Sequence, residues 1–152
     1  RVIKSLQKKF DYVFATKNRY PGAPAVETHE IKKNRAFSVA GQEVIPVEVM
    51  HNQLQVFGFR FNDLVYLTDV KTVAAQQKKW LKNVKVLVVN ALRHEPHPMH
   101  FNLKEALAFI DEVQPEKAYL THISHLLGFH EEVEKTLPKN VFLGYDGLSI
   151  TL

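Results

Sequence analysis

The sequence contains no cysteine among its 152 residues. This absence excludes a disulfide framework and any site built on thiolates, so a bound metal would be held by imidazole, carboxylate and water, ligands that suit Zn, Mn or Fe. No apolar run approaches the roughly 20 residues that span a bilayer, and no stretch has the pattern of a cleaved leader. We therefore expect a cytoplasmic protein without a membrane partner.

The rest of the composition is that of one folded domain over residues 1–152. Hydrophobic residues make up 45% of the chain and charged residues 24%, which suffices for one core but not for two. The net charge of +4 and the isoelectric point near 9.2 admit an anionic partner, without separating a small phosphate ester from nucleic acid. Lysine pairs are scattered over polar stretches, which is the usual pattern of a solvated surface.

Acidic and imidazole side chains stand where three apolar runs end. His51 follows residues 44–50, Asp69 follows residues 64–68, and His122 follows residues 117–121. Because the ends of strands that run the same way meet at one edge of a sheet, residues distant in sequence can converge there. The pattern predicts a metal site made of these three residues, although three ligands are few for a complete one.

Two interpretations of Asp69 remain open from its position alone. A carboxylate directly after a buried strand is costly unless it is paired, caps a helix or binds a cation. Asp69 precedes a predicted helix over residues 70–81, whose first amides it would satisfy as a cap. The ligand and the cap are equally favoured, and one oxygen could serve each role.

The order of predicted elements indicates an α/β (α+β) protein with a mixed sheet flanked by helices. A helical period covers residues 2–14, and the proline-rich stretch 20–24 forms a rigid connection. Antiparallel strands are predicted over residues 36–39, 44–49, 54–61 and 64–67. Helices at 70–81, 103–113 and 131–137 then alternate with strands at 85–90, 117–121, 141–143 and 148–152, the last two as a hairpin. Asn102 and Glu105 have the spacing of a capping box.

Six of the eight histidines lie between His94 and His130. The stretch 93–100 is a loop stiffened by Pro96 and Pro98, and an imidazole there could protonate a leaving oxygen or neutralise charge on a phosphoryl group. A polar surface loop is the alternative. For His122, the alternative to a metal ligand is a strand-end histidine that is hydrogen-bonded to a loop. For His125, such a structural role is the favoured interpretation.

Five segments together resemble the C-terminal part of the metallo-β-lactamase superfamily. They are Leu67-Thr68-Asp69, the stretch from Ala91 through Pro96-His97-Pro98-Met99-His100 to Leu107, Tyr119 to His125, Tyr145-Asp146-Gly147, and Tyr20-Pro21-Gly22-Ala23-Pro24. Within the superfamily the sequence is most similar to the cyclic phosphodiesterase branch, in particular the phosphoribosyl 1,2-cyclic phosphate phosphodiesterases. The resemblance covers essentially the whole chain and implies the C-terminal part of a four-layer αβ/βα fold.

The resemblance implies a role for each matching residue. His51 corresponds to the histidine that completes the ligand set of a first metal, Asp69 to the carboxylate that bridges two metals, and His122 to the last ligand of the second metal. His100 corresponds to the histidine that contacts the substrate phosphate and can protonate the leaving group. The resemblance therefore implies that His100 and Asp69 are the catalytic residues. His97 and His125 are then expected to contact substrate.

The implied activity is hydrolysis of a small cyclic phosphodiester by a hydroxide that bridges two divalent metals, Zn or Mn. The His-x-His-x-Asp-His motif that supplies most ligands in the superfamily is absent from these 152 residues. We therefore expect a C-terminal fragment of a longer metallohydrolase that is metal-free or binds metal weakly and is inactive alone. The alternatives are a nuclease related to transfer-RNA processing enzymes and a non-catalytic fragment that self-associates; a homo-oligomer is expected in either case.

Overall fold

The computed structural model describes residues 2–151 and divides the chain into two compact units, Arg1–Lys32 and Lys33–Leu152. The candidate ligands all belong to the second unit. The expectation of a single domain over the whole chain stays a prediction, since two compact units can belong to one domain.

The first unit contains two short helices in place of the one expected over residues 2–14. They are α1 (Val2–Lys9) and α2 (Asp11–Phe14), and neither contains a buried residue. Phe10 leaves the helical region between them, with φ −126° and ψ 47°. Asp11 begins α2, and its carboxylate accepts a hydrogen bond from the Tyr12 N–H, the local bonding that disfavours aspartate inside a helix.

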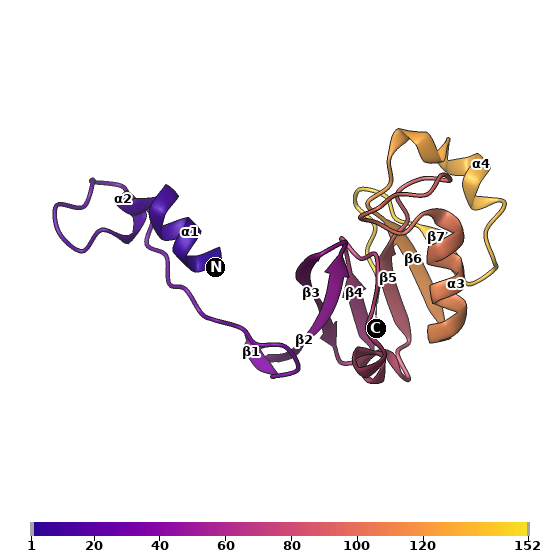
Figure 1. Cartoon of the computed structure of the whole chain (residues 1–152), viewed down its shortest axis with the longest axis horizontal. Helices are drawn as coiled ribbons and strands as arrows, with labels where there is room; N and C mark the ends of the chain where they lie inside the picture. Colours follow the sequence, from indigo (N-terminus) through magenta and orange to yellow (C-terminus); the bar gives the residue numbers. More distant parts are fainter. Residues whose placement is uncertain (1, 152) are drawn as a thin grey trace. The chain divides into compact units, whose positions relative to one another are not determined.

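The second unit is built on one mixed sheet of seven strands in sequence order (Figure 1). The strands are β1 (Phe37–Val39), β2 (Gln42–His51), β3 (Leu54–Phe61), β4 (Leu64–Leu67), β5 (Val86–Asn90), β6 (Lys117–Thr121) and β7 (Val141–Leu143). Pairing is antiparallel from β1 to β4 and parallel from β4 to β7. The predicted mixed sheet is confirmed, with a run of antiparallel strands followed by parallel ones.

The directions of the strands follow from these pairings. The strand β3 is antiparallel to both β2 and β4, so two reversals leave β2 running in the same direction as β4. The parallel strands β5, β6 and β7 share that direction. The C-terminal ends of β2, β4, β5 and β6 therefore lie along one edge of the sheet.

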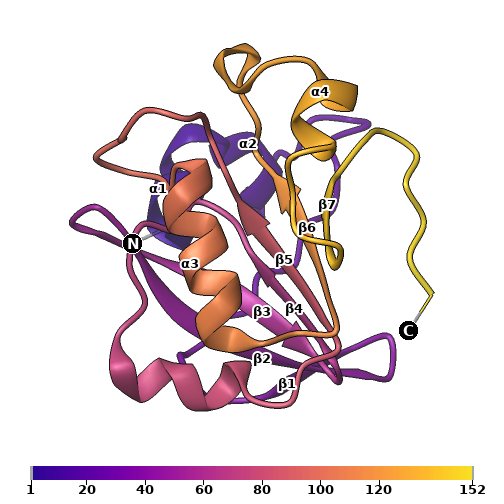
Figure 2. The same cartoon turned by 90° about the vertical axis from the view of Figure 1, so that its right-hand side faces the viewer.

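One face of the sheet is covered by α3 (Leu103–Val113), which lies over the sheet and runs roughly alongside β5 (Figure 2). The predicted capping box at its start is present: Asn102 accepts from the Glu105 N–H, and Glu105 accepts from the Asn102 N–H. Phe109 and Ile110 of α3 pack into a core of alternate strand residues such as Leu67 and Leu120. Shorter helical segments are η1 (Ala75–Leu81), η2 (His125–Leu127) and α4 (His130–Glu134).

The helix expected over residues 70–81 is wrong in its first half. Only Ala75–Leu81 is helical, as a 3-10 helix, and residues 70–74 are extended or bent. The Lys71 and Thr72 amides donate to Met50 O, and Met50 N–H donates to Thr72 O, so these groups are used in a bridge to β2. The spacing of apolar side chains in this segment is helical, but the long-range backbone hydrogen bonds to Met50 determine its extended conformation.

The hairpin expected at the C-terminus is also wrong. The strand β7 pairs in parallel with β6, and residues 148–151 form no strand. The Leu148 N–H donates to Tyr145 O, which makes a local turn after β7. The apolar residues near the end of the chain have the sequence pattern of a strand, but they pair with no other strand among the described residues.

Backbone groups on the outer edge of β2 are already used by other parts of the second unit. Pro46 has no N–H, and its carbonyl accepts from the Asn34 N–H. The Glu48 N–H donates to the side-chain oxygen of Gln77, which is 1% exposed. Met50 is paired with the segment at Thr72 through both of its backbone groups. These contacts close this edge against further strands.

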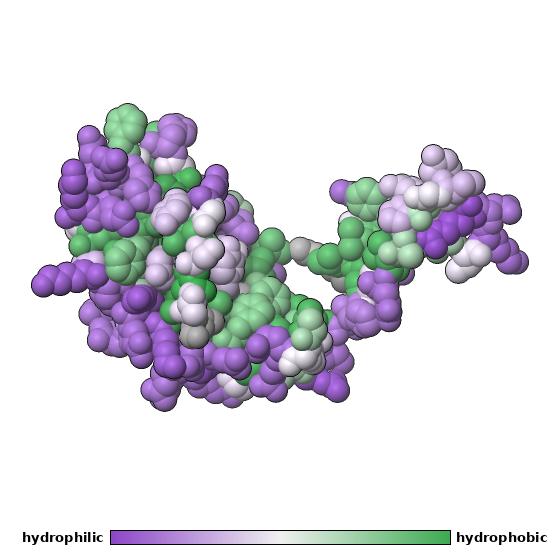
Figure 3. Space-filling view, turned by 180° about the vertical axis from the view of Figure 1, so that it is seen from behind, coloured by the Kyte–Doolittle hydropathy of each residue, from purple (hydrophilic) through white to green (hydrophobic). Residues whose placement is uncertain are grey.

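The face of the sheet opposite α3 carries a row of apolar side chains. The strand register places them side by side on five strands: Phe59, Tyr66, Val88, Tyr119 and Phe142. The Tyr119 and Phe142 rings stack with centroids 5.5 Å apart, and Tyr66 is 40% exposed. Figure 3 shows hydrophobic residues at the surface of the second unit between hydrophilic ones. No helix among residues 2–151 is long and apolar enough to cross a membrane.

We expect Glu105→Gln to destabilise the fold at neutral pH. Although burial raises the pKa of Glu105, hydrogen bonds from Lys71 and from the Asn102 amide bring that pKa below its ordinary value. A carboxyl group with a lowered pKa stabilises the fold above its unfolded pKa, and this contribution is lost as the pH falls through the folded value. In thermal unfolding, the deficit of Glu105→Gln should therefore shrink below about pH 4. The exposed Glu116→Gln is the control, and a deficit that stays constant down to pH 3 would contradict the assignment.

Candidate metal centre

Four chain segments bring histidine and aspartate side chains to the same edge of the sheet. His51 is the last residue of β2, Asp69 lies two residues beyond β4, and His122 directly follows β6. The loop after β5 contributes His100. The parallel direction of these strands explains why residues up to 71 positions apart, from His51 to His122, meet in one place.

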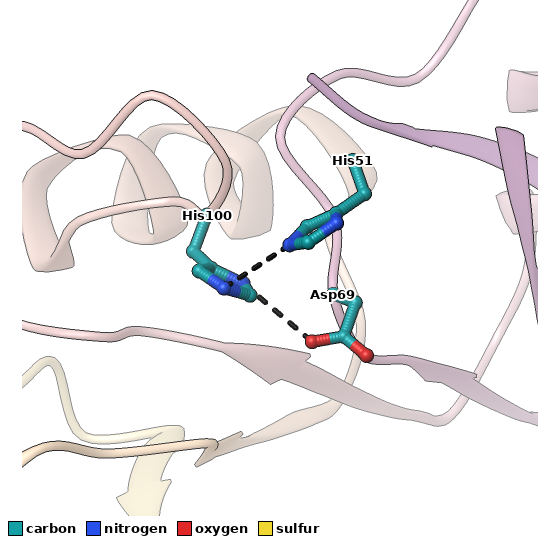
Figure 4. Close-up of side chains that lie close together, drawn as sticks. All are labelled: His51, Asp69 and His100. Carbon is teal, nitrogen blue, oxygen red and sulfur yellow. Dashed lines mark hydrogen bonds and ion pairs between the residues drawn. The ribbon is translucent and has the colours of Figure 1, made fainter. Parts of the chain in front are cut away.

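The four side chains form one cluster. The Nε2 atoms of His51 and His100 are 3.2 Å apart, and His100 Nδ1 lies 3.6 Å from Asp69 Oδ1 (Figure 4). The same Oδ1 lies 3.6 Å from His122 Nε2. One donor atom from each of His51, Asp69 and His100 can be chosen so that all three lie within 4.8 Å of one another. Asp69 is thus central, with a histidine on each side.

The backbone at two of these residues adopts a conformation that costs energy. Asp69 has φ 56° and His122 has φ 55°, both in the left-handed region. Residues other than glycine are uncommon there, and such conformations gather at functional sites. No helix begins at Val70, so the alternative in which Asp69 caps a helix is excluded. The kink instead turns the carboxylate at the end of β4 toward the histidines.

The loop that carries His97 and His100 is tied down at its base. The Leu92 N–H donates to Phe101 O, and the Leu103 N–H donates to Arg93 O. His94 makes two further contacts: its carbonyl accepts from Asn102 Nδ2, and its Nε2 lies 2.9 Å from Leu127 O. Pro96 and Pro98 fix φ between these anchors. The loop is held in one conformation, which lowers the entropy lost when His100 engages a ligand.

The environment lowers the pKa of two imidazoles at the site, those of His100 and His97. Burial lowers the pKa of His100, and the imidazoles of His122 and His51 lower it further against the opposing effect of Asp69. Burial also lowers the pKa of His97, with contributions from Arg93 and Lys71. His100 Nδ1 is buried without a hydrogen-bond partner among the described residues. A neutral imidazole with an unshared nitrogen is the form that binds a metal or accepts a proton.

The predicted site residues are not all equally close to the cluster. His51, Asp69, His100 and His122 are brought together, and the His97 ring stacks on His100 with centroids 5.1 Å apart. His125 is exposed at the start of η2, with no contact to the cluster among those described. The roles assigned to these residues stay predictions.

Asn90 is the neighbour of the site that the sequence analysis missed. It ends β5, is fully buried, and pairs with the backbone next to Asp69. A polar residue at the end of a buried apolar strand needs a hydrogen-bond partner. The run from Val86 to Asn90 could therefore have indicated that Asn90 binds a polar group near the site.

The donor set fits a divalent transition metal. Two ligands of one tetrahedral zinc, each about 2.1 Å from the ion, lie about 3.4 Å apart. The 3.6 Å between Asp69 Oδ1 and His122 Nε2 is of this size. Imidazole and carboxylate are ligands for Zn, Mn and Fe, and the buried, unshared nitrogen of His100 remains available to a group bound beside the metal.

Comparison with known proteins finds one matching family model and several similar structures. A family model described as a beta-lactamase superfamily domain matches residues 1–123. The crystal structure of a diphosphatase from the PhnP family is similar, with a TM-score of 0.86 and 32% identity over 99% of this chain and 55% of that one. The Zn²⁺-bound PqqB from Methylobacterium extorquens shares the fold, with a TM-score of 0.61 and 15% identity over 80% of this chain and 55% of that one.

A curated relative is much longer than this chain. An octanoyltransferase of Porphyromonas gingivalis (strain ATCC BAA-308 / W83) is 35% identical over 148 residues, which are 97% of this chain and 30% of that protein. The chain therefore spans about half of the PhnP-family diphosphatase and under a third of the curated relative.

We expect Asp69→Gly and Asp69→Ala to differ in stability although both remove the carboxylate. Alanine keeps the Cβ that makes φ 56° unfavourable, whereas glycine adopts this φ freely. In the absence of metal, Asp69→Gly should be more stable than Asp69→Ala by about 1 kcal/mol, which urea unfolding can measure. Equal stabilities would mean that the left-handed conformation carries no strain.

Proposed function

The chain belongs to the metallo-β-lactamase superfamily, and on that premise we propose that it supplies one half of the two-metal centre of a phosphodiesterase. The observation that carries the proposal is the convergence of His51, Asp69, His100 and His122, from four segments, at separations of 3.2 to 3.6 Å. A structural role alone would not place two histidines beside one carboxylate and leave the buried Nδ1 of His100 without a partner.

We assign metal binding to His51, Asp69 and His122. The Asp69 carboxylate has two oxygens, and Oδ1 already lies between His100 and His122, so this residue can serve two ions. When bound, Zn or Mn would activate water and neutralise charge on the phosphoryl oxygens. The protein's part is to hold the donors at this spacing on the rigid ends of strands.

His100 acts on the substrate in this proposal. His100 is 8% exposed, and burial lowers its pKa. In the neutral form its N–H can donate a hydrogen bond to a phosphate oxygen, and after the ring has taken up a proton the imidazolium can pass that proton to the departing alkoxide. His97, stacked on His100, orients that ring and contacts the substrate. His125, exposed nearby in sequence, is the outer substrate contact.

The substrate class rests on similarity and charge. The diphosphatase of the PhnP family is 32% identical to this chain, which supports a phosphoryl compound as the substrate. The net charge of +4 favours an anion. We propose a small cyclic phosphodiester. The octanoyltransferase name gives little support to acyl transfer here, because 70% of that protein lies outside the match.

The other half of the centre is proposed to come from residues outside this chain. Two four-coordinate ions have about eight ligand positions, whereas this chain offers three ligand residues and His100. The His-x-His-x-Asp-His motif of the superfamily, absent here, would supply the remainder.

Calorimetric titration of the chain with Zn²⁺ and with Mn²⁺ tests the half-site. We expect weak binding of no more than one ion per chain, weakened at least about tenfold further by Asp69→Ala and by His122→Ala. His29→Ala is the matched control, because His29 is 75% exposed and belongs to the first unit. Tight binding of two ions per chain would overturn the half-site proposal, and no loss in Asp69→Ala would overturn the ligand assignment.

Activity is tested in a protein that joins this chain to a segment with the His-x-His-x-Asp-His motif. We expect hydrolysis of a small cyclic phosphodiester and none by the 152-residue chain alone. His100→Ala should lower turnover by about 10² to 10⁴ while leaving the Zn²⁺ affinity unchanged. A parallel loss of Zn²⁺ affinity would make His100 a ligand. Faster cleavage of structured RNA than of the small ester would favour the nuclease alternative.

A further inference from the structure

We propose that Asn90 is a positioning residue that sets the spacing of the metal centre through the backbone of Val70. The inference rests on the proposed function, because it concerns the geometry of the same site. Asn90 is the last residue of β5, 0% exposed, and it follows four consecutive buried apolar residues. A buried polar side chain at such a position needs hydrogen-bond partners within the protein.

The Asn90 amide binds both polar groups of one residue. Its Oδ1 accepts from the Val70 N–H at 2.7 Å, and its Nδ2 donates to Val70 O at 3.1 Å. The register between β4 and β5 ends at Leu67 and Val89, so the side chain continues the pairing where the backbone ladder stops. An amide suits this position, because its acceptor oxygen and donor nitrogen are separate atoms that can bind the N–H and the carbonyl of Val70 at the same time.

This pair fixes the residue next to Asp69. The kink at φ 56° turns Asp69 away from the ladder, and Val70 is the first residue after it. Since Val70 is 0% exposed, water cannot replace the amide of Asn90. The two hydrogen bonds between the Asn90 side chain and the Val70 backbone therefore fix the residue that follows Asp69. They keep the Asp69 carboxylate directed toward His100 and His122.

The Val70 carbonyl that Asn90 binds is also connected to the segment of His100. Val70 O accepts a second hydrogen bond from the Phe101 N–H at 3.0 Å, and Phe101 directly follows His100. One carbonyl thus joins the segment of Asp69 to the segment of His100. A displacement of Val70 would change the 3.6 Å separation between Asp69 Oδ1 and His100 Nδ1.

The residues after Asn90 connect the end of β5 to the other ligand. The Ala91 N–H donates to Thr121 O at 3.0 Å, directly before His122. Leu92 O accepts from the Ser124 N–H at 2.9 Å, two residues beyond His122. The end of β5 is therefore in contact with the chain beside Asp69, His100 and His122, although Asn90 itself is not a ligand.

The test compares Asn90→Ala with Val86→Ala in the full 152-residue chain. Val86 is 5% exposed on the same strand and the same face, four residues from Asn90, so its truncation also lowers stability but at the opposite end of β5. The readouts are the ¹⁵N ring resonances of His100 and His122 without metal, and the Zn²⁺ affinity. A purely structural role would change both readouts equally in the two variants.

We expect Asn90→Ala to shift both ring resonances and to weaken Zn²⁺ binding about tenfold or more, as loss of a residue behind a metal ligand does, while Val86→Ala changes neither. Ring shifts in Asn90→Ala no larger than those in Val86→Ala would overturn the proposal. If Asn90→Ala does not fold, Asn90→Ser, whose hydroxyl can make one of the two bonds, is judged by the same criterion. If the unsubstituted chain binds no Zn²⁺, the metal proposal fails, yet the resonances still decide the role of Asn90.

Discussion

The shared direction of β2, β4, β5 and β6 is the constraint on which the rest of the structure depends. Only because β3 runs against both of its neighbours does β2 point the same way as the parallel strands. With one reversal fewer, His51 would lie at the opposite edge, about 20 Å or more from Asp69 and His122. The clustering of donors, the low pKa of His100 and the anchoring of its loop all presuppose this arrangement.

Elements whose signals are local in sequence were predictable. The capping box of Asn102 and Glu105 lies within four residues, and the parallel strands are short buried runs, so the helix and the strands appear at the expected places. The failures have a common physical cause. The segment at Thr72 pairs with Met50, and residues 148–151 find no partner strand, and neither fact can be read from a window of neighbouring residues.

The same distinction applies to the site. His51, Asp69 and His122 could be singled out because the end of a strand is visible in sequence, and residues at strand ends meet. The place of His100 in the cluster could not be predicted in this way, because it depends on how a loop folds back against the segment after β4 through the hydrogen bond from the Phe101 N–H to Val70 O. Asn90 shows the limit most clearly: its identity suggests an unknown partner, and only the fold reveals that this partner is Val70.

The closed outer edge of β2 limits how this sheet can be extended. Pro46, Glu48 and Met50 have their outward groups satisfied by Asn34, Gln77 and Thr72, so a strand cannot be added there without first breaking native bonds. The face of the sheet opposite α3 carries the row of apolar side chains that includes Tyr66 and Tyr119. Addition of a strand along these positions of β2 is thereby suppressed, whereas the apolar row leaves a face on which a second layer can pack.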